Sequence, residues 1–387
     1  LMNFGSTTLT SATLGYSVNG VAGASMPWVG SLANLASDTV LVGTTTLANG
    51  THEIKVWSSM PNATVDSFNL NDTATATVIT CNLFNGIYTV GGASADFPTI
   101  MAAINAISAC GISGPVTLNI NPGTYTEQVI IPPILGATFF NRVTLQASTS
   151  LAQDVTITNP ASGSNSTVKL NGADYITLQH LTINATGSLA ARGIELAAGA
   201  DYNLIQGVVV NIDPAASTLW GSSGIYSGST VDHHNIIIAN TVNNGYYGIY
   251  LEGSYSNRES QNIVEGNTIM GFYSTGIYGY YQDTLSVRSN NITSGVYSAY
   301  QYGMELYECY GPMQVLKNRV VMLGTYYTYG MYLSYVTGDI VERALVANNF
   351  VAQTAQTTSS IYGIYIYNCS NLDVFYNSVR ITGGGTY

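Results

Sequence analysis

The stretch YYGIYL at residues 246–251 decides the fold, because close variants of it recur along the second half of the chain. In each variant a glycine is followed by Ile or Met, then by Tyr or Glu, and then mostly by an apolar residue. This alternation is typical of a half-buried β-strand. The copies are spaced by 24 to 33 residues, and their glycines are Gly193, Gly224, Gly248, Gly276, Gly303, Gly330 and Gly363.

A second series, exemplified by IIANTV at residues 237–242, alternates with the first and carries one asparagine per period. Each period is therefore predicted to hold three very short strands and to stack on the previous one as a coil of a parallel β-helix, about 4.8 Å per coil. We expect the asparagine to occupy a sharp turn in the left-handed region and to bond the same residue one coil up and down. The predicted corner residues are Asn240, Asn267, Asn290, Asn318, Asn348 and Asn377.

The asparagine corner and the period resemble the right-handed parallel β-helix superfamily of pectate lyases, pectin methylesterases and many bacterial surface proteins. The resemblance covers about residues 86 to 387 and implies a fold rather than an activity. In addition, DFPTIMAAINAI (96–107) and VTLNINPGTYTEQVIIPP (116–133) are similar to the opening of pectin methylesterases, which implies a helix that caps the first coil. Helical spacing of apolar residues from Thr99 to Ile107 predicts the same helix. That family's catalytic aspartates and arginine find no match here, so esterase activity does not carry over.

Residues 1–80 are predicted to form a separate all-β module, because runs such as TLGYSV (13–18) and HEIKVWS (52–58) alternate with turn signals, as in a sandwich. NFGSTTLTSATLGYSVNG (3–20) and NGTHEIKVW (49–57) resemble an immunoglobulin-like, cell-adhesion-related module of secreted Bacteroidetes proteins, which implies a spacer role. In that family a strand precedes NFG, so we expect this module to be clipped. The expected protein is all-β: an immunoglobulin-like sandwich (1–80), a junction (81–95) and a right-handed parallel β-helix with a short capping helix (96–387), as a fragment of a longer secreted chain.

The small number of charged residues and the negative net charge limit the partners that the protein can bind. Only 8% of the residues are charged, and 10 Lys+Arg stand against 21 Asp+Glu, for a net charge of −11. Such a surface argues against nucleic acid or an anionic membrane as partner. No run of 18 apolar residues occurs, so no membrane span is expected, and an extracellular or cell-surface location is predicted.

Catalytic candidates are weak. The best local feature is Asp232-His233-His234, for which a polar loop at a coil corner is the favoured interpretation. The carboxylates lie at different offsets from their coil glycines and are not expected to stack, although loops of unequal length could bring some together. We expect no metal and no cofactor. A polysaccharide lyase or glycoside hydrolase of the pectate-lyase-like superfamily is nevertheless kept as an alternative.

Tyrosines gather in the second half of the chain and give the preferred binding hypothesis. They are expected in outward columns that either cover one another or form an aromatic surface suited to sugar rings or another protein. Glu305 interrupts the main column, a place where a carboxylate is expected only if it is wet. The predicted binding face comprises Tyr226, Tyr250, Tyr278, Tyr280, Tyr307, Tyr332, Tyr365 and Tyr367.

Other residues carry smaller predictions. Cys81 and Cys110 flank the capping helix and are predicted to be bonded, whereas Cys309 and Cys369 lie two coils apart and are predicted to be free thiols. Thr39, Thr73 and Thr284 each follow Asp and resemble the O-glycosylation signal of Bacteroidetes surface proteins. The sequence thus favours a non-enzymatic surface or adhesion protein that contacts polysaccharide, another surface protein or copies of itself.

Overall fold

The computed structural model describes residues 1–66, 68–159, 166–187, 190–228, 231–354 and 359–382. The chain divides into two compact units, Leu1–Leu83 and Phe84–Tyr387. No helix among these described residues is long and apolar enough to cross a membrane. Four short 3₁₀ turns occur, at Pro61–Ala63, Asn69–Asn71, Ala152–Asp154 and Pro214–Ala216.

The first unit forms one antiparallel sheet, and its described residues do not build the second sheet of the predicted sandwich. The run TVLVG (39–43) has the composition of a strand, but the segment 33–49 forms only an isolated bridge, between Ser37 and Met2. Val40 and Val42 instead pack through their side chains against a small core that includes Trp28, so this segment has no backbone ladder. The strands are β1 (Leu9–Val18), β2 (Val21–Ala22), β3 (Met26–Leu32), β4 (Gly50–Ser59) and β5 (Thr73–Thr80).

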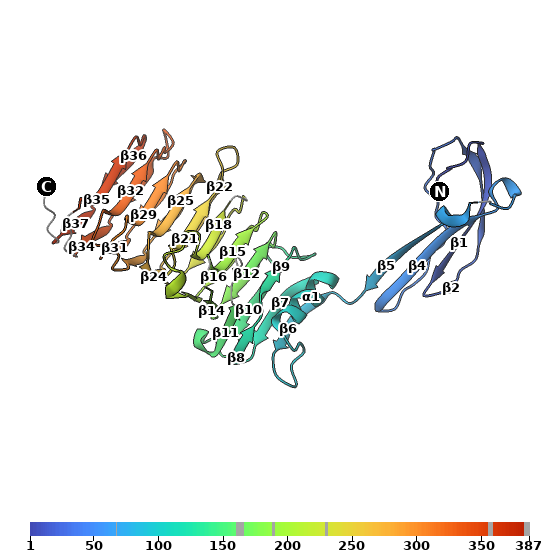
Figure 1. The fold of residues 1–387 in the computed structure, drawn as a ribbon, viewed down its shortest axis with the longest axis horizontal. Coiled ribbons are helices and arrows are strands. Elements are labelled where there is room, and N and C mark those ends of the chain that lie inside the picture. The colour runs from blue at the N-terminus through green and yellow to red at the C-terminus, as the bar shows by residue number, and fades with distance from the viewer. Residues whose placement is uncertain (67, 160–165, 188–189, 229–230, 355–358, 383–387) are drawn as a thin grey trace. The chain divides into compact units, whose positions relative to one another are not determined.

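The second unit is a parallel β-solenoid of about ten turns, in which three sheets run the length of the stack (Figure 1). Its first strand, Phe84–Val90, lies within the stretch predicted to be a junction, but pairs with the next coil as part of the first sheet. The first sheet contains β6 (Phe84–Val90), β7 (Ile112–Ile120), β10 (Val143–Ala147), β13 (Ile176–Gln179), β16 (Leu204–Gln206), β19 (Ile236–Ile238), β23 (Ile263–Glu265), β27 (Ser286–Arg288), β30 (Gln314–Leu316), β33 (Ala344–Ala347) and β36 (Leu372–Phe375).

The second sheet contains β8 (Gly123–Thr126), β11 (Val155–Asn159), β14 (Thr182–Ala185), β17 (Val209–Ile212), β20 (Thr241–Asn243), β24 (Thr268–Phe272), β28 (Asn291–Ser294), β31 (Arg319–Met322), β34 (Phe350–Gln353) and β37 (Ser378–Ile381). The third sheet contains β9 (Val129–Ile131), β12 (Ser166–Asn171), β15 (Arg192–Ala197), β18 (Ser223–Gly228), β21 (Tyr247–Glu252), β25 (Thr275–Tyr280), β29 (Gln301–Tyr307), β32 (Thr328–Ser334) and β35 (Ile361–Tyr367). A further pair, β22 (Glu259–Ser260) and β26 (Gln282–Asp283), joins two corners.

The repeated glycine phrase lies in the third sheet with the predicted register. Its aliphatic residue pairs with its counterpart in the next coil, from Ile194 to Ile364, and the members from Ile194 to Met331 are fully buried. The glycine is required because a Cβ at Gly303 would lie 2.5 Å from the carbonyl oxygen of Gly330 and 2.2 Å from Val320 Cγ1. Close approach of successive coils therefore explains why glycine recurs in this phrase.

A buried asparagine ladder runs between the first and second sheets and corrects the predicted corner in two respects. Its members bond coil to coil, as when Asn318 Oδ1 accepts from the Asn290 backbone N–H at 3.0 Å. The left-handed conformation belongs to the residue before the ladder, such as Lys317 (φ 57°). In the next coil Asn348 (φ 59°) holds that place, so Asn349 rather than Asn348 joins the ladder. The ladder is Asn240, Asn267, Asn290, Asn318, Asn349 and Asn377.

Helix α1 (Ile100–Cys110) forms where helical spacing was predicted. Thr99 Oγ1 accepts from the Ala102 backbone N–H, and the Glu127 carboxylate accepts from the first two helical N–H groups, each at 3.0 Å. The apolar stripe that includes Ile104 is fully buried and α1 contacts β6, β7 and β9 of the first coils. Glu127 lies in the phrase PGTYTEQV, so this phrase anchors the helix.

The cysteines fall into two classes. Cys81 and Cys110 are both disulfide-bonded. Cys309 and Cys369 are free, as predicted, and burial raises the pKa of the Cys309 thiol to about 12. The buried Cys309 thiol is therefore unreactive in the folded protein.

Candidate functional site

The outward side of the third sheet, from β15 to β35, is lined by tyrosines, and we call it the tyrosine face. Rings of adjacent coils lie almost parallel, with centroids 5.0 Å apart for Tyr226–Tyr250, 4.7 Å for Tyr250–Tyr278 and 5.3 Å for Tyr332–Tyr365. The predicted register is thus confirmed, and the tyrosines lie outside the aliphatic core. The main column contains Glu195, Tyr226, Tyr250, Tyr278, Glu305, Tyr332 and Tyr365.

A second column stacks in the same way, because Tyr329 lies 4.9 Å from Tyr302 and 4.6 Å from Tyr362 with nearly parallel rings. Stacked rings cover one another's faces, which leaves less ring face open to a sugar. Tyr250 is buried and its hydroxyl donates to Glu252, whereas Tyr332 and Tyr365 are half-buried. The binding face stays a prediction.

A third predicted column lies four residues after the repeated glycine and contains Tyr280, Tyr307 and Tyr367. This column is discontinuous. Tyr280 and Tyr307 contact each other at 5.1 Å with tilted rings. Ser334 separates Tyr307 from Tyr367, which is 45% exposed. This column adds hydroxyl groups to the tyrosine face but no unbroken stack.

Glu195 begins the main column and is neutralised by two cations. Lys169 Nζ and Arg192 Nη1 each lie 3.2 Å from Glu195 Oε1. The Arg192 guanidinium also lies over the Tyr226 ring, 3.5 Å from its centroid. A cation thus bridges the buried carboxylate and the neighbouring aromatic face.

Glu305 occupies an equivalent place in mid-column with different partners. Thr275 Oγ1 donates to Glu305 Oε2 at 3.2 Å. Burial raises the pKa of Glu305 to about 7, against the lowering effect of the Thr275 bond. Glu305 is half-buried, since the neighbouring tyrosines cover only part of its side chain. The expectation that this carboxylate is wet stays a prediction.

Glu252 is the second carboxylate of this region. Its Oε2 accepts from the Tyr250 hydroxyl at 2.6 Å. Burial, and then the charges of both Glu252 and Glu305, raise the pKa values of Tyr247 and Tyr278. The two carboxylates therefore act on the same pair of tyrosines.

Asp232, His233 and His234, the weak catalytic candidates, do not converge on one centre. Asp232 is fully buried. His233 Nδ1 accepts from the Ser260 backbone N–H at 3.0 Å, whereas the His234 ring stacks on Tyr202 at 4.4 Å. Their side chains thus serve three different packing contacts at a coil corner.

Asp232 instead meets Glu259 inside the solenoid, through one hydroxyl. Ser227 Oγ lies 2.8 Å from Asp232 Oδ2 and also bonds Glu259 Oε1. A serine hydroxyl has a single proton, so it can donate to only one of the two carboxyl groups. The other carboxyl group must carry a proton and donate it to Ser227.

The remaining bonds show which oxygen of Glu259 can carry such a proton. Glu259 Oε2 accepts from Gln282 Nε2 at 2.8 Å and from Asn262 Nδ2 at 3.2 Å, which leaves Oε1 as the protonated oxygen. Burial raises the pKa of Glu259 to about 8. A protonated Glu259 can therefore donate to Ser227, whose own proton can then go to Asp232.

The sequence did not reveal this pair because residues 253–258 lengthen one corner and shift the offset of Glu259. Pairing of β22 with β26 restores the alignment by placing Glu259 opposite Gln282. The sequence also did not reveal a second buried asparagine ladder, in which Asn203, Asn235 and Asn262 bond backbone N–H groups of neighbouring coils. The signal was an asparagine immediately before each first-sheet strand of these coils.

Comparison with known proteins places the chain by fold only. No protein-family model and no curated protein matches it. Among solved structures, it is similar to a GH136 lacto-N-biosidase from Eubacterium ramulus, with 10% identity, TM-score 0.48 and coverage of 76% of this chain and 68% of the other. The second unit of the chain is a parallel β-solenoid.

Two further solved structures share this fold at low identity. Rice weevil pectin methyl esterase has 15% identity and TM-score 0.40, with coverage of 76% of this chain and 88% of the other. An alginate lyase from a Paenibacillus species has 12% identity and TM-score 0.39, with coverage of 73% and 99%. From these identities and TM-scores nothing follows about the activity of this chain.

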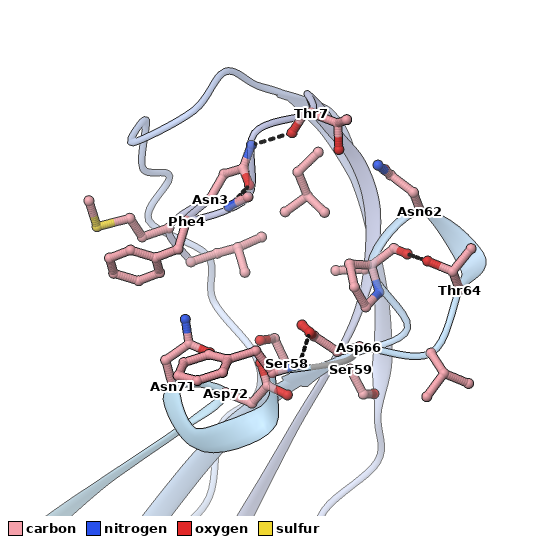
Figure 2. A pocket seen from close by; sticks show the side chains of 18 residues that line it. Asn3, Phe4, Thr7, Ser58, Ser59, Asn62, Thr64, Asp66, Asn71 and Asp72 are labelled. Carbon is pink, nitrogen blue, oxygen red and sulfur yellow. Dashed lines mark hydrogen bonds between the residues drawn. The ribbon is translucent and has the colours of Figure 1, made fainter.

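A separate pocket of about 480 Å³ lies in the first unit. Figure 2 shows Phe4 on one side of it, with Asn71 and Asp72 facing it. Burial, and then the charge of Asp66, raise the pKa of Asp72. No group of three His, Cys, Asp or Glu side chains that could hold a metal occurs in the described part of the chain. The pocket thus offers polar groups without a catalytic constellation.

Proposed function

We propose that the protein is a non-enzymatic extracellular or cell-surface structural and adhesion protein whose tyrosine face contacts a polysaccharide. The row of tyrosine hydroxyls repeated coil by coil along the third sheet carries this proposal. A hydroxyl both donates and accepts, so this row can bond successive sugar units of one polymer. Many weak contacts along one chain then add to a useful affinity.

The other parts of the chain fit a supporting role. The first unit acts as an immunoglobulin-like spacer of Bacteroidetes type, and α1 acts as a cap on the open edge of the first coil, where an uncovered ladder would attract other strands. Another surface protein or a second copy of this chain is the alternative partner for the tyrosine face.

The double variant Tyr332→Phe, Tyr365→Phe tests this proposal, because it removes two hydroxyls and keeps both stacked rings. Retention on insoluble cellulose or chitin should fall, with an unchanged melting temperature. Tyr376→Phe is the matched control, since Tyr376 is 80% exposed and lies outside the tyrosine face. Equal retention of all three proteins would contradict the proposal.

A polysaccharide-degrading enzyme is the second candidate, and Glu305 with Glu252 favours it. Glu305, with a pKa near 7, and Glu252, which acts on the same two tyrosines, supply the two carboxyl groups that general acid and base catalysis of glycoside hydrolysis uses. Release of reducing ends from a glycan, lost in Glu305→Gln, would support this candidate. A rise in absorbance from unsaturated uronates, abolished by a chelator, would indicate a lyase instead.

We further propose that the protein is O-glycosylated. Thr39 and Thr73 are exposed and open to O-glycosylation, whereas the half-buried Thr284 hydroxyl donates to Asp283 Oδ1 at 3.0 Å. Mass analysis of protein from the native host should find glycans at Thr39 and Thr73 first. Unmodified peptides at all three positions would reject the proposal.

A further inference from the structure

Two glutamates share the main column of the tyrosine face, but only one of them has a cation. Glu195 is paired with both Lys169 and Arg192. The strand pairing shows which residue of each coil is equivalent to Arg192. In the coil that contains Glu305, this residue is Tyr302. None of the ion pairs formed by the described residues includes Glu305.

The aromatic stack is also interrupted at Glu305. Tyr278 stacks on Tyr250 on one side, and Tyr332 stacks on Tyr365 on the other. Glu305 lies between Tyr278 and Tyr332 in the pairing register, and no ring contact joins these two tyrosines in the described structure. The sides of Tyr278 and Tyr332 that face Glu305 are therefore not stacked against another tyrosine of the column.

The Glu195 end shows which group fits between a carboxylate and such a ring. There, Arg192 contacts Glu195 at 3.2 Å and covers the Tyr226 face at 3.5 Å. Glu305 offers the same carboxylate and the same kind of aromatic neighbour without the protein's own cation. A cationic group from outside would gain both a charge-assisted hydrogen bond and a cation–π contact.

We propose that Glu305 and the rings beside it form a binding site for a cationic amine of the ligand. This proposal rests on the proposed function of the tyrosine face. It implies that the bound polysaccharide is one that carries free amino sugars. Polymers rich in uronic acids are disfavoured, because their carboxylates would meet Glu252 and Glu305. The hydroxyls along the same face favour an amino sugar over the lysine side chain of a protein partner.

The site should depend on pH. The groups that face Glu305 are Tyr247 on β21, Tyr278 on β25, Tyr302 on its own strand and Tyr332 on β32. Glu252 acts on Tyr247 and Tyr278. The pKa values of Tyr247, Tyr278 and Tyr302 are raised by burial, so these phenols stay neutral near pH 7. Because the pKa of Glu305 is about 7, binding should strengthen as the pH rises to 7 and weaken again once the sugar amine loses its proton.

The test uses glucosamine oligomers and N-acetylglucosamine oligomers of equal length, which differ at the 2-amino group: it is a free cationic amine in the first and a neutral acetamide in the second. Calorimetry should show tighter binding of the glucosamine oligomer, and Glu305→Gln should weaken it at least about tenfold. Glu342→Gln is the matched control: Glu342 is exposed in a loop, and this variant changes the net charge equally. The control measures non-specific attraction of a polycation and should bind like the wild type.

The outcomes separate this site from the proposed function. Equal affinity of Glu305→Gln and wild type for the glucosamine oligomer would overturn the site, even if the hydroxyl variants still lose retention on neutral polysaccharide. If no polymer binds, NMR of the Glu305 carboxyl carbon still tests the site, since glucosamine monomer should lower the pKa of Glu305. A monomer that leaves this pKa unchanged overturns the site, as does binding of polylysine without any glucosamine binding.

Discussion

Glu259 keeps a proton inside the solenoid at neutral pH, and this has a measurable effect on stability. Its pKa is about 8 in the folded protein, above the ordinary 4.5 of an unfolded glutamate. The folded state therefore binds more protons between these values. The resulting stabilisation is fully present below pH 4.5 and is lost as the pH rises to 8.

Glu259→Gln should remove this dependence. The amide can donate to Ser227 and accept from Gln282, so it imitates the protonated glutamate. Denaturant titrations should show the wild-type free energy of unfolding falling from pH 4.5 to 8, with a smaller fall in Glu259→Gln. Glu342→Gln, as the exposed control, should follow the wild type. Parallel curves for all three proteins would mean that Glu259 is ionised in the folded state.

Residue-scale chemistry was the least predictable part of the site. The sequence drew attention to Asp232 next to His233, but sequence neighbours in a strand or corner point to opposite sides. The partner of Asp232 is Glu259, one coil away, and only the pairing of corners of unequal length brings them together. Column membership of Tyr278 and Glu305 was predictable, because both follow the repeated glycine by a fixed count.

At the scale of elements, Asn348 and Asn349 provide a matched pair. Asn349 is 1% exposed, and its amide donates to the Val315 carbonyl while its Oδ1 accepts from the Asn318 backbone N–H. Asn349→Ala leaves both groups unsatisfied and should cost about 2–4 kcal/mol of unfolding free energy. Asn348→Gly suits the left-handed conformation and should change stability by less than about 0.5 kcal/mol.

Chemical denaturation of these two variants checks the ladder assignment. A larger loss of unfolding free energy in Asn348→Gly than in Asn349→Ala would support Asn348 as the ladder residue, as the sequence predicted. The pattern of an apolar residue, two further residues and Asn fits Asn348, which is why the prediction slipped by one. The inward residue two places after each ladder asparagine, Val351 here, was the distinguishing signal.

The stacked tyrosines are also structural elements. Tyr329 has a parallel ring on either side, and each such pair contributes about 0.5–1.5 kcal/mol. Tyr329→Ala should therefore lower the free energy of unfolding by about 1–3 kcal/mol, whereas Tyr329→Phe should stay close to wild type. Thermal melts followed by circular dichroism measure both. An unchanged Tyr329→Ala melt would show that the stack adds no stability.

At the scale of the whole molecule, the two units differ in the size of their cores. The first unit buries a cluster of five hydrophobic residues, whereas the core of the second extends through the coils. A small core gives marginal stability, so the first unit should unfold at the lower temperature. Trp28 and Trp57 belong to this unit, whereas Trp220 is 74% exposed. Tryptophan fluorescence should change before far-ultraviolet circular dichroism; coincident transitions would contradict this order.

The second unit could be predicted from the sequence because it is built from repeats. Seven copies of the glycine phrase over-determine the solenoid, so its three sheets and their register could be predicted without a structure. The first unit has no repeat, and a run such as TVLVG has strand-like composition whether or not a neighbouring strand is present. Its single sheet therefore could not be distinguished from one half of a sandwich.

The coil-to-coil pairing gives the solenoid a direction in its response to force. Its interstrand hydrogen bonds point along the stacking direction, so tension along that direction pulls each bond apart end to end. Because every interface between coils carries the same tension, the weakest interface opens first and the others follow singly. The buried asparagine ladder adds side-chain bonds at these same interfaces and raises the force that each one withstands.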